Sequence, residues 1–369
     1  MSDDELDAWL RLVHRTGLGR TAMRRLLAAL GSPQAVAAAT PAALADVIGP
    51  ARAQALNEPP DDHAKRLAAT RAWLDAAPDR RRVLTLADAD YPPLLLQAAD
   101  PPLLLYLEGR HALLATSSVA IVGSRKPTPQ GLDNARRLAR QLGEHGWTVV
   151  SGLAKGIDGA AHLGALDAGA GTVAVVGTGL EQVYPLAHRA LAARIAEDGL
   201  LVSEFPIGMP LQPDNFPQRN RIIAGLTRGT LVVEAALKSG SLITARLAAE
   251  AGREVFAIPG SIQSPQARGC HALLRDGAKL VESVDDVLEE LGNEARPAAH
   301  DPAPAQPAAD DTPDDQVLGA LGHDPATLDA LIARCGWPAP ALNARLMELE
   351  LEGRVMRLPG GLFQRRGAA

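Results

Sequence analysis

Four short segments of this sequence combine glycine, serine and basic residues in a way that suits anion binding. The first holds Gly123, Ser124, Arg125 and Lys126, between an apolar run and a helical pattern. Free backbone amides and the positive end of a helix favour an anion at such a junction. The glycine spacing matches neither a dinucleotide-binding fingerprint nor a P-loop. We therefore predict phosphate binding here, with an ordinary strand-to-helix turn that exposes its charges as the alternative.

The second segment, residues 151–162, reads S-G-L-A-K-G-I-D-G-A-A-H. Gly152 and Gly156 permit close backbone approach, and Lys155 can reach a phosphate. Asp158 and His162 are four residues apart, so they share one face if the segment is helical. An acid/base or metal-binding pair is one interpretation. A capping aspartate beside a hydrogen-bonded core histidine is the favoured one, because no second acid lies nearby in the sequence.

The third segment, residues 216–221, reads F-P-Q-R-N-R. Arg219 and Arg221 offer the planar forks that contact phosphate in a bidentate way. Asn220 between them offers an amide for a base edge, and Phe216 is one of few rings available to stack. We predict a nucleic-acid contact here, with a solvated helix start as the alternative.

The fourth segment, residues 234–244, reads E-A-A-L-K-S-G-S-L-I-T. Ser239, Gly240 and Ser241 stand at a predicted helix start, next to Lys238. Backbone amides in such a turn can form a nest for an anion, and a plain helix cap is the alternative. Glu234 ends a buried strand, where we expect it to pair with a loop arginine.

The charge of the chain is unevenly distributed. Residues 210–246 contain five basic and two acidic residues, whereas the 369-residue chain contains 37 basic and 43 acidic residues and has a net charge of -6. The overall balance excludes a uniformly basic nucleic-acid binder. A basic crevice within an acidic protein predicts a polyanionic ligand. Aromatic residues make up only 3% of the chain, so few rings are available for stacking.

The sequence lacks the usual marks of a metal site, a disulfide framework or export. Its two cysteines, Cys270 and Cys335, are too few for a four-thiolate metal site and lie far apart. The N-terminus, M-S-D-D-E-L-D-A-W-L, has neither the basic start nor the apolar run of a signal peptide. No run approaches the ~18 apolar residues of a membrane span. We expect a cytoplasmic protein in a reducing compartment, with no membrane partner, no metal and no cofactor.

Residues 80–292 alternate short apolar runs with helical patterns, such as those at 129–144 and 241–251. Continuous apolarity indicates strands that are buried on both faces, as in a parallel sheet covered by helices. We predict an α/β domain with an extended Rossmann-like fold, whose ligand binds beyond the carboxyl ends of the strands at a switch in strand order. The predicted strands lie at 118–123, 147–152, 172–177, 200–204, 230–235 and 254–260.

Two smaller parts flank this domain. Residues 1–75 have apolar residues at helical spacing, interrupted by a G-x-G turn at 17–19. This pattern indicates a helix-hairpin-helix, whose turn amides contact phosphate, or a related sterile-alpha-motif-like (SAM-like) module, with a small interaction bundle that uses glycine to turn as the alternative. Residues 293–315 are a Pro/Ala-rich linker. Residues 316–366 predict three helices and a hairpin, as in a winged helix. Its predicted recognition helix, 339–352, has three glutamates against one arginine, which favours a protein partner over duplex DNA.

Taken together, the motifs of residues 80–290 resemble the DNA-processing protein A (DprA/Smf) family. The resemblance rests on V-G-S-R-K-P-T-P, S-G-L-A-K-G-I-D-G-A-A-H, G-T-G-L-E-Q-V-Y-P, S-E-F-P-I-G, F-P-Q-R-N-R-I-I-A-G-L, V-V-E-A-A-L-K-S-G-S-L-I-T-A and F-A-I-P-G, in this order. It implies a dimer that binds single-stranded DNA, protects incoming strands and helps to load the RecA recombinase during natural transformation. The basic pocket of the family maps onto 123–125, Lys155 and 219–221. Some members have lysine directly after Tyr-Pro, where this chain has Leu186.

Two enzymatic interpretations compete with a non-enzymatic DNA binder. Nucleoside-monophosphate phosphoribohydrolases of the same broad superfamily carry a motif similar to P-G-G-x-G-T followed by a glutamate. Here the corresponding loop is K-S-G-S-L-I-T-A-R, and no glutamate follows until Glu250. The acid for glycosidic cleavage is therefore misplaced. A dinucleotide-dependent redox enzyme is disfavoured because the glycine fingerprint is absent. We predict no catalytic residues.

Overall fold

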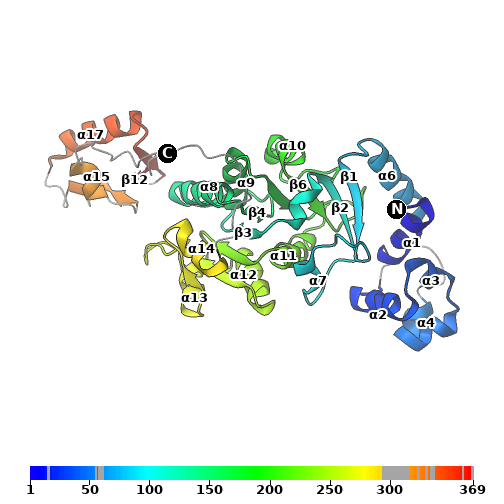
Figure 1. Ribbon diagram of the computed structural model, residues 1–369. Coiled ribbons are helices and arrows are strands. Elements are labelled where there is room, and N and C mark those ends of the chain that lie inside the picture. Colours follow the sequence, from blue (N-terminus) through cyan, green and yellow to red (C-terminus); the bar gives the residue numbers. More distant parts are fainter. Residues whose placement is uncertain are drawn as a thin grey trace.

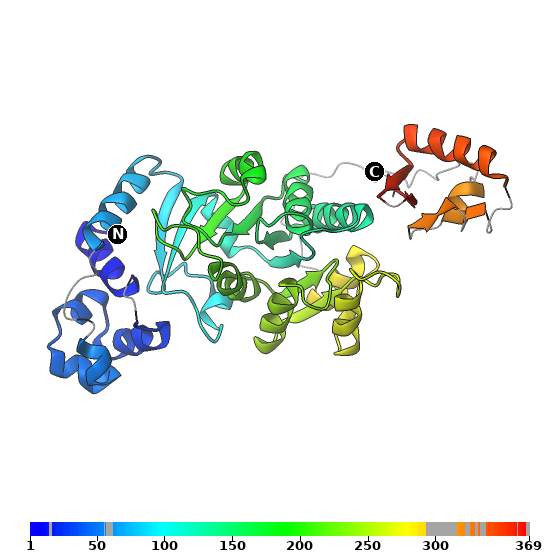
Figure 2. The ribbon, with the colours of Figure 1, turned by 180° about the vertical axis from the view of Figure 1, so that it is seen from behind.

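The computed structural model describes residues 1–14, 17–54, 56, 62–292, 316–321, 325–328, 331–332, 337–359 and 361–366. Small helices occupy one end of the molecule, a large sheet covered by helices lies in the middle, and a second small unit occupies the other end (Figure 1). The view from behind shows the same order, with the N-terminus and the C-terminal unit at opposite ends (Figure 2). No helix in these described ranges is long and apolar enough to cross a membrane.

The central sheet has nine strands in the order β1-β2-β6-β5-β4-β3-β7-β8-β9. The strands from β6 to β9 are parallel, and β2 and β1 join at one edge in antiparallel fashion. All six predicted strands are confirmed, so the predicted α/β class is correct. The strands are β1 (Arg81–Thr85), β2 (Leu104–Gly109), β3 (Ser118–Val122), β4 (Thr148–Ser151), β5 (Thr172–Val175), β6 (Leu200–Ser203), β7 (Gly229–Val232), β8 (Glu254–Ala257) and β9 (Lys279–Leu280).

Helices cover both faces of this sheet because its strands are apolar on both sides. On β3, Val119 and Ile121 face one helical layer, whereas Ala120 and Val122 face the other, and all four are buried. One layer contains α8 (Pro129–Glu144), α9 (Ile157–Asp167), α10 (Arg189–Asp198) and α14 (Val284–Leu291). The other contains α7 (Pro93–Leu96), α11 (Asn215–Leu226), α12 (Ser241–Glu250) and α13 (Arg268–Arg275). Figure 1 shows α8, α9 and α10 above the sheet and α7, α11 and α12 below it.

The strand order reverses between β3 and β7. From β3 the chain proceeds outward through β4, β5 and β6, then crosses to the other side of β3 and continues through β7, β8 and β9. The connections after β3 and β7 therefore leave on opposite faces and separate at the carboxyl edge of the sheet. Ligands of open parallel sheets bind at such a point.

The N-terminal part is a set of short helices that shares an apolar core with the edge of the sheet. Trp9, Leu10 and Leu26 are buried in one cluster with Trp73 and with Tyr106 of β2. The rings of Trp73 and Tyr106 meet edge to face at 5.9 Å. The helices are α1 (Asp3–Val13), α2 (Arg20–Leu30), α3 (Pro33–Ala38), α4 (Pro41–Ile48), α5 (Pro50–Gln54) and α6 (His63–Asp75).

The C-terminal unit contains α15 (Gln316–Leu321), β10 (Ala326–Thr327), α17 (Ala339–Leu351), β11 (Val355–Leu358) and β12 (Leu362–Arg365). Its strands form a small antiparallel sheet in the order β10-β12-β11. The apolar positions of the sequence pattern close its core, with Leu318, Leu331 and Leu346 all buried. The predicted linker at 293–315, Cys335 and Gly360 lie outside the described residues.

Candidate nucleic-acid interface

A cleft of about 580 Å³ opens at the switch in strand order, beyond the ends of β3 and β7. It lies where the sequence predicts the site, and the four segments supply most of its lining. Eleven of the fourteen predicted site residues line it, and Gly152, Lys155 and Arg221 do not. The eleven are Gly123, Ser124, Arg125, Lys126, Phe216, Arg219, Asn220, Lys238, Ser239, Gly240 and Ser241.

The loop after β3 is held by a residue that the sequence did not single out. The Gln266 amide donates to the Lys126 carbonyl (3.2 Å), and its oxygen accepts a hydrogen bond from the Ser124 hydroxyl (3.3 Å). That hydroxyl in turn accepts from the backbone N–H of Lys126 (3.1 Å). Ser124 is thereby buried, whereas the side chains of Arg125 and Lys126 are exposed at the cleft. Gln266 thus fixes the backbone from which both cations project.

The glycines of residues 151–156 let two loops touch each other. Gly156 has a φ of 85°, and a Cβ there would collide with the carbonyl oxygen of Ser124. The Ile157 N–H donates to the same carbonyl at 3.2 Å. The predicted close approach is therefore made between two parts of the chain. Lys155 is exposed on this loop, next to the cleft-lining Ala154.

Asp158 and His162 have the structural roles that the sequence favoured. Asp158 accepts hydrogen bonds from the backbone N–H groups of Gly152 (3.2 Å) and Ala154 (3.3 Å), and burial raises its pKa. His162 is fully buried. It accepts from the Leu153 N–H (3.3 Å) at Nε2 and lies 2.9 Å from the Thr172 hydroxyl at Nδ1. In the described ranges no group of acidic, cysteine or histidine side chains is suited to hold a metal ion.

Arg219 forms the floor of the cleft and does not project into it. Its side chain is only 4% exposed, and its guanidinium donates to the carbonyl of Val175 at the end of β5. A Cβ on Gly152 would overlap this guanidinium, so glycine is needed there. Burial lowers the pKa of Arg219 to about 10, and the nearby Asp158 carboxylate opposes that shift, so Arg219 stays charged at neutral pH. Its charge therefore acts from beneath any bound ligand.

The segment 239–241 leads into α12, which begins at Ser241 and has Gly240 as its N-cap. Gly240 has a φ of -63° and a ψ of -20°, which is right-handed helical geometry. This geometry does not form the type of nest that alternates right- and left-handed residues. The hydroxyls of Ser239 and Ser241 lie 2.7 Å apart, and the Asn220 amide donates to the Gly240 carbonyl at 3.4 Å. What remains of the prediction is a helix N-terminus that faces the cleft.

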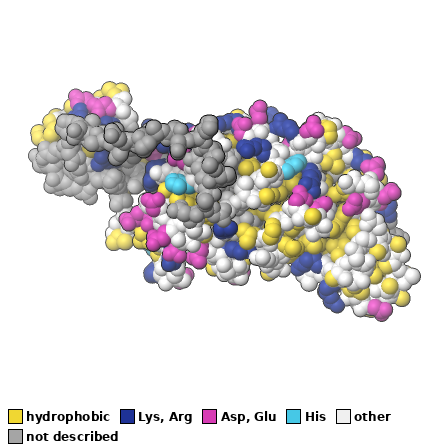
Figure 3. All heavy atoms as spheres, in the orientation of Figure 1, with side chains coloured by type: hydrophobic (Ala, Val, Ile, Leu, Met, Phe, Trp, Pro, Cys, Tyr) yellow, Lys and Arg dark blue, Asp and Glu magenta, His cyan; other side chains and the backbone are white. Residues whose placement is uncertain are grey.

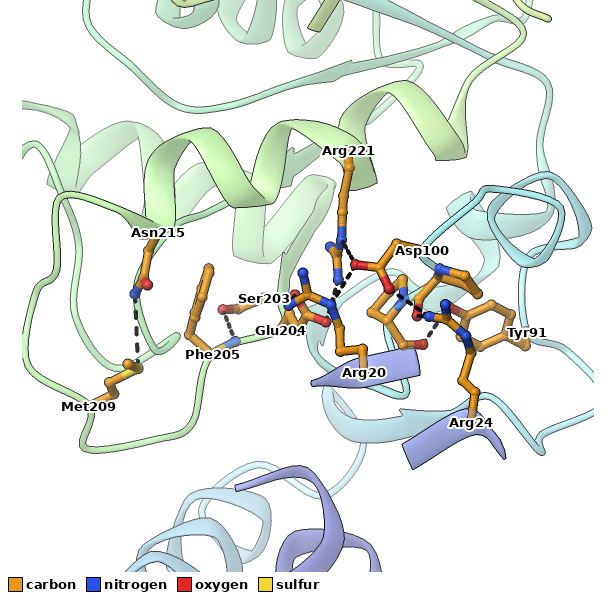
Figure 4. A network of polar contacts seen from close by, with 12 residues as sticks. Arg20, Arg24, Tyr91, Asp100, Ser203, Glu204, Phe205, Met209, Asn215 and Arg221 are labelled. Atoms are coloured by element: carbon orange, nitrogen blue, oxygen red, sulfur yellow. Dashed lines mark hydrogen bonds and ion pairs between the residues drawn. The ribbon is translucent and has the colours of Figure 1, made fainter. Parts of the chain in front are cut away.

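Arg221 points away from the cleft, and the expectation that it lies beside Arg219 in one binding surface is wrong. The Arg221 side chain forms ion pairs with Glu204 (2.6 Å) and Asp100 (3.2 Å). Figure 4 shows it descending from α11 toward these carboxylates. Residues two apart on a helix do not face the same way. Arg221 is therefore only 12% exposed in its side chain, at the junction with the N-terminal helices.

The same two carboxylates bind the start of α2. Arg20 and Arg24 each contact Asp100 at 2.6 Å, and Arg20 lies 3.7 Å from Glu204 (Figure 4). The basic residues next to the G-x-G turn are thus occupied by carboxylates of this chain. Of the two interpretations of residues 1–75, this contact favours an interaction module over one that grips phosphate.

Four exposed cations surround the cleft without an ion-pair partner in the described part of the chain: Arg125, Lys126, Lys155 and Lys238. Three of them are among the five lysines of the whole sequence. Figure 3 shows acidic and basic side chains interspersed over one face of the molecule, so its charge is mixed there. The four unpaired cations therefore give the cleft a local positive charge.

The acidic side chains near the cleft are engaged in holding the fold. Glu234 accepts from the N–H (2.9 Å) and the hydroxyl (2.5 Å) of Thr128, and burial raises its pKa. The expected pairing of Glu234 with a loop arginine is therefore wrong. Glu250 lies at the far end of α12, 61% exposed in its side chain and 3.6 Å from Arg246. Asp158 is the acidic side chain among the described lining residues, and it is bound to two amides.

Known protein families identify this architecture. A family model described as DNA recombination-mediator protein A matches residues 82–292, and a model of the DprA winged helix domain matches residues 301–361. The chain belongs to the DNA recombination-mediator protein A family. The C-terminal unit is accordingly a winged helix, as the sequence predicted.

Relatives of this family match most of the chain. Protein Smf of Escherichia coli is 42% identical over 310 residues, 82% of each chain. The DNA processing protein DprA of Streptococcus pneumoniae is 48% identical over 207 residues, 56% of this chain and 73% of the relative. Its crystal structure has a TM-score of 0.65 and covers 77% of this chain and 97% of that one at 38% identity.

A second solved structure concerns DNA processing protein A from Helicobacter pylori and describes its single-stranded DNA binding mode. It has a TM-score of 0.52 and 32% identity, and it covers 57% of this chain and 95% of that one. The family resemblance stated from the motifs of residues 80–290 is confirmed.

Proposed function

We propose that this chain is a single-stranded DNA-binding protein of DNA processing, which protects incoming strands and helps to load RecA during natural transformation. The observation that carries the proposal is the set of four exposed, unpaired cations around the cleft at the switch point of the sheet. Elsewhere in the described chain many arginines are paired, such as Arg20, Arg24 and Arg221. Unpaired cations repel one another, so their clustering needs a ligand that is itself anionic.

The form of the site favours a flexible strand over a duplex. A volume of about 580 Å³ suits one or two nucleotides. Lys155 lies outside this volume, so the cationic surface continues past a single bound phosphate. A single strand can bend its backbone into such a cleft and continue along the surface, whereas a stiff duplex cannot. The Helicobacter pylori relative, described by its single-stranded DNA binding mode, supports the same choice.

RecA loading, a homodimeric state and action in the cytoplasm form the finer part of this proposal. All three follow from the family resemblance. A protein that passes incoming strands to a recombinase has to act in the compartment that contains the recombinase and the chromosome. A dimer would also grip one strand at two clefts, which raises its effective affinity.

We propose that the protein acts by binding and not by catalysis. Glycosidic cleavage of a nucleotide needs an acid beside the scissile bond. The cleft offers the buried Asp158, which two amides already occupy, while Glu250 is remote at the other end of α12. The phosphoribohydrolase alternative predicts free adenine when the protein is incubated with AMP, and our proposal predicts none.

We propose further that the winged helix contacts protein and not duplex DNA. Arg345 on α17 is 2.7 Å from Glu348 and 3.5 Å from Glu352. Its charge is therefore neutralised locally. A helix that presents glutamates repels the phosphate backbone on which duplex affinity depends.

The proposal is tested with Arg125→Ala and Lys155→Ala in a fluorescence-anisotropy titration of a labelled single-stranded oligonucleotide. Each variant should lose about tenfold or more in affinity, because a charge-assisted contact contributes ~1.5–3 kcal/mol. Both side chains are exposed, so thermal stability should not change. Arg246→Ala is the matched control: it removes an exposed cation that is paired with Glu250 away from the cleft. Wild-type affinity in Arg125→Ala, or an equal loss of affinity in Arg246→Ala, would contradict the assignment of the cleft as the binding site.

A further inference from the structure

The chain has eleven aromatic side chains, and nearly all of them serve its cores. Three are not buried: Trp337, Phe216 and Tyr184. Trp337 packs against the core of the winged helix. Tyr184 and Phe216 remain, both in the central domain. The eight buried rings belong to Trp9, Trp73, Tyr91, Tyr106, Trp147, Phe205, Phe256 and Phe363.

The exposed Tyr184 ring and the half-buried Phe216 ring lie against each other at the rim of the cleft. Their centroids are 5.2 Å apart, and their planes are tilted by 45°. Phe216 lines the cleft from the start of α11, while Tyr184 comes from the connection between β5 and α10. The Tyr184 side chain is 46% exposed, although a ring of this size is usually covered. Nothing in the sequence places the two rings together, because 32 positions separate them.

The backbone fixes the position of the pair. A Cβ on Gly177 would lie 2.9 Å from Cδ1 of Phe216, so the chain after β5 packs closely under that ring. Gly177 and Tyr184 belong to the same connection. This connection therefore contacts Phe216 twice, through the backbone at Gly177 and through the ring of Tyr184. A ring held in this way loses little side-chain freedom when a flat ligand stacks on it.

We propose that Tyr184 and Phe216 form a stacking surface for an unpaired nucleobase, next to the phosphate site of the cleft. The inference rests on the proposed function. In a single strand a charged phosphate alternates with a flat apolar base, and the cleft combines cations with flat rings. Arg125 and Lys238 provide charge, the two rings provide flat surface, and Leu186 beside them is 77% exposed and uncharged. Stacking is tolerant of sequence because every base has a π-face.

Tyr184→Leu and Tyr184→Phe test the inference. The first removes the ring and keeps an apolar side chain, and the second keeps the ring and removes only the hydroxyl. Affinity is measured by anisotropy for an oligothymidylate and for a strand of the same length with abasic sites throughout its central part. Tyr184→Leu should bind the base-containing strand about five- to a hundredfold more weakly, and Tyr184→Phe should bind like wild type.

Two further readouts separate stacking from other effects. The slope of log affinity against log salt should be unchanged in Tyr184→Leu, because no phosphate contact is lost. On the abasic strand wild type and Tyr184→Leu should bind equally. Equal loss on both strands, an altered salt slope or wild-type affinity for oligothymidylate would overturn the inference.

The outcome also distinguishes this inference from the proposed function. If wild type fails to bind any single strand, the proposed function itself is wrong. If wild type binds, Arg125→Ala binds weakly and Tyr184→Leu binds normally, only the stacking surface is wrong. A Tyr184→Leu variant that changes its elution in gel filtration but not its DNA affinity would show that the rings contact protein, which also overturns the inference.

Discussion

Replacement of Asp100 by asparagine tests how the N-terminal helices are attached to the central domain. The Asp100 carboxylate accepts hydrogen bonds from Arg20 and Arg24 of α2, both at 2.6 Å, and from Arg221 of α11 at 3.2 Å. Burial raises its pKa, but the hydrogen bonds from Arg24 and Arg20 and the guanidinium charges lower it more, to about 2. Asparagine keeps the shape and removes the charge.

The size of the effect follows from that pKa. A shift from 3.8 to about 2 corresponds to at most ~2.5 kcal/mol of stabilisation. The Asp100 side chain is 33% exposed, so solvent screening reduces the expected loss to about 1–2 kcal/mol. The lost charge also leaves Arg20 and Arg221 with Glu204 as their carboxylate partner, while Arg24 keeps only the carbonyls of Ala99 and Pro101. We expect Asp100→Asn to lower the free energy of unfolding by this amount at pH 7.

Urea unfolding, followed by circular dichroism between pH 8 and pH 3, is the assay. Because the folded-state pKa of Asp100 is depressed, its contribution is complete above about 3.8 and is lost as pH falls toward 2. The deficit of the variant should therefore be constant from pH 8 to pH 5 and should shrink below pH 4. Asp90→Asn is the control: Asp90 pairs with Arg82 at 2.5 Å but is 60% exposed, so its loss should stay within ~0.5 kcal/mol. Equal effects of the two substitutions at pH 7 would refute the reasoning.

Two further predictions concern acid stability and the winged helix. Burial lowers the pKa of His162 and of His14 to about 3, so both are neutral in the folded protein while their unfolded forms take up a proton below about 6.5. The free energy of unfolding should therefore fall as pH drops below 6.5, by up to ~1.4 kcal/mol per pH unit for each histidine. In urea titrations at several pH values, His162→Gln should reduce the slope of the free energy of unfolding against pH. An unchanged slope in the variant would contradict this prediction. Removal of residues 316–369 should leave single-strand affinity largely intact, because the charge of these residues is nearly balanced and α17 is acidic. A large loss of affinity in an anisotropy titration would show that the C-terminal unit completes the binding surface. Binding of duplex DNA by the isolated C-terminal fragment would contradict the proposal that this unit contacts protein.

The sheet was predictable because its signal is local. In a run such as T-V-A-V-V-G at 172–177, apolar side chains on both faces are buried only when the strand lies in a sheet between two helical layers. The strands, and the sheet edge at which a ligand is expected, therefore followed from the sequence. The antiparallel edge strands β1 and β2 were not predicted. β2 follows Pro101 and Pro102, and its pairing with β1 and β6 is a long-range contact.

The errors at the site arose where a run of residues was interpreted without its helix. Arg219, Asn220 and Arg221 are adjacent in sequence, but successive residues on α11 are rotated by about 100°. Arg219 therefore enters the floor of the cleft, while Arg221 turns to Asp100, whose position 121 residues earlier no local pattern reveals. The form of the predicted nest at 239–241 was not predictable for a similar reason, because it depends on the backbone angles of Gly240, which are right-handed helical.

The central claim is most directly tested by competition between single-stranded and duplex DNA for the full-length protein over a range of salt concentrations. Unlabelled single strand should displace a labelled single strand at far lower concentration than a blunt duplex of the same length and sequence. Four exposed cations around the cleft predict a slope of log affinity against log salt of about −3 for the single strand, at ~0.7 per neutralised phosphate. Equal competition by the duplex, or single-strand affinity that does not depend on salt, would contradict the account.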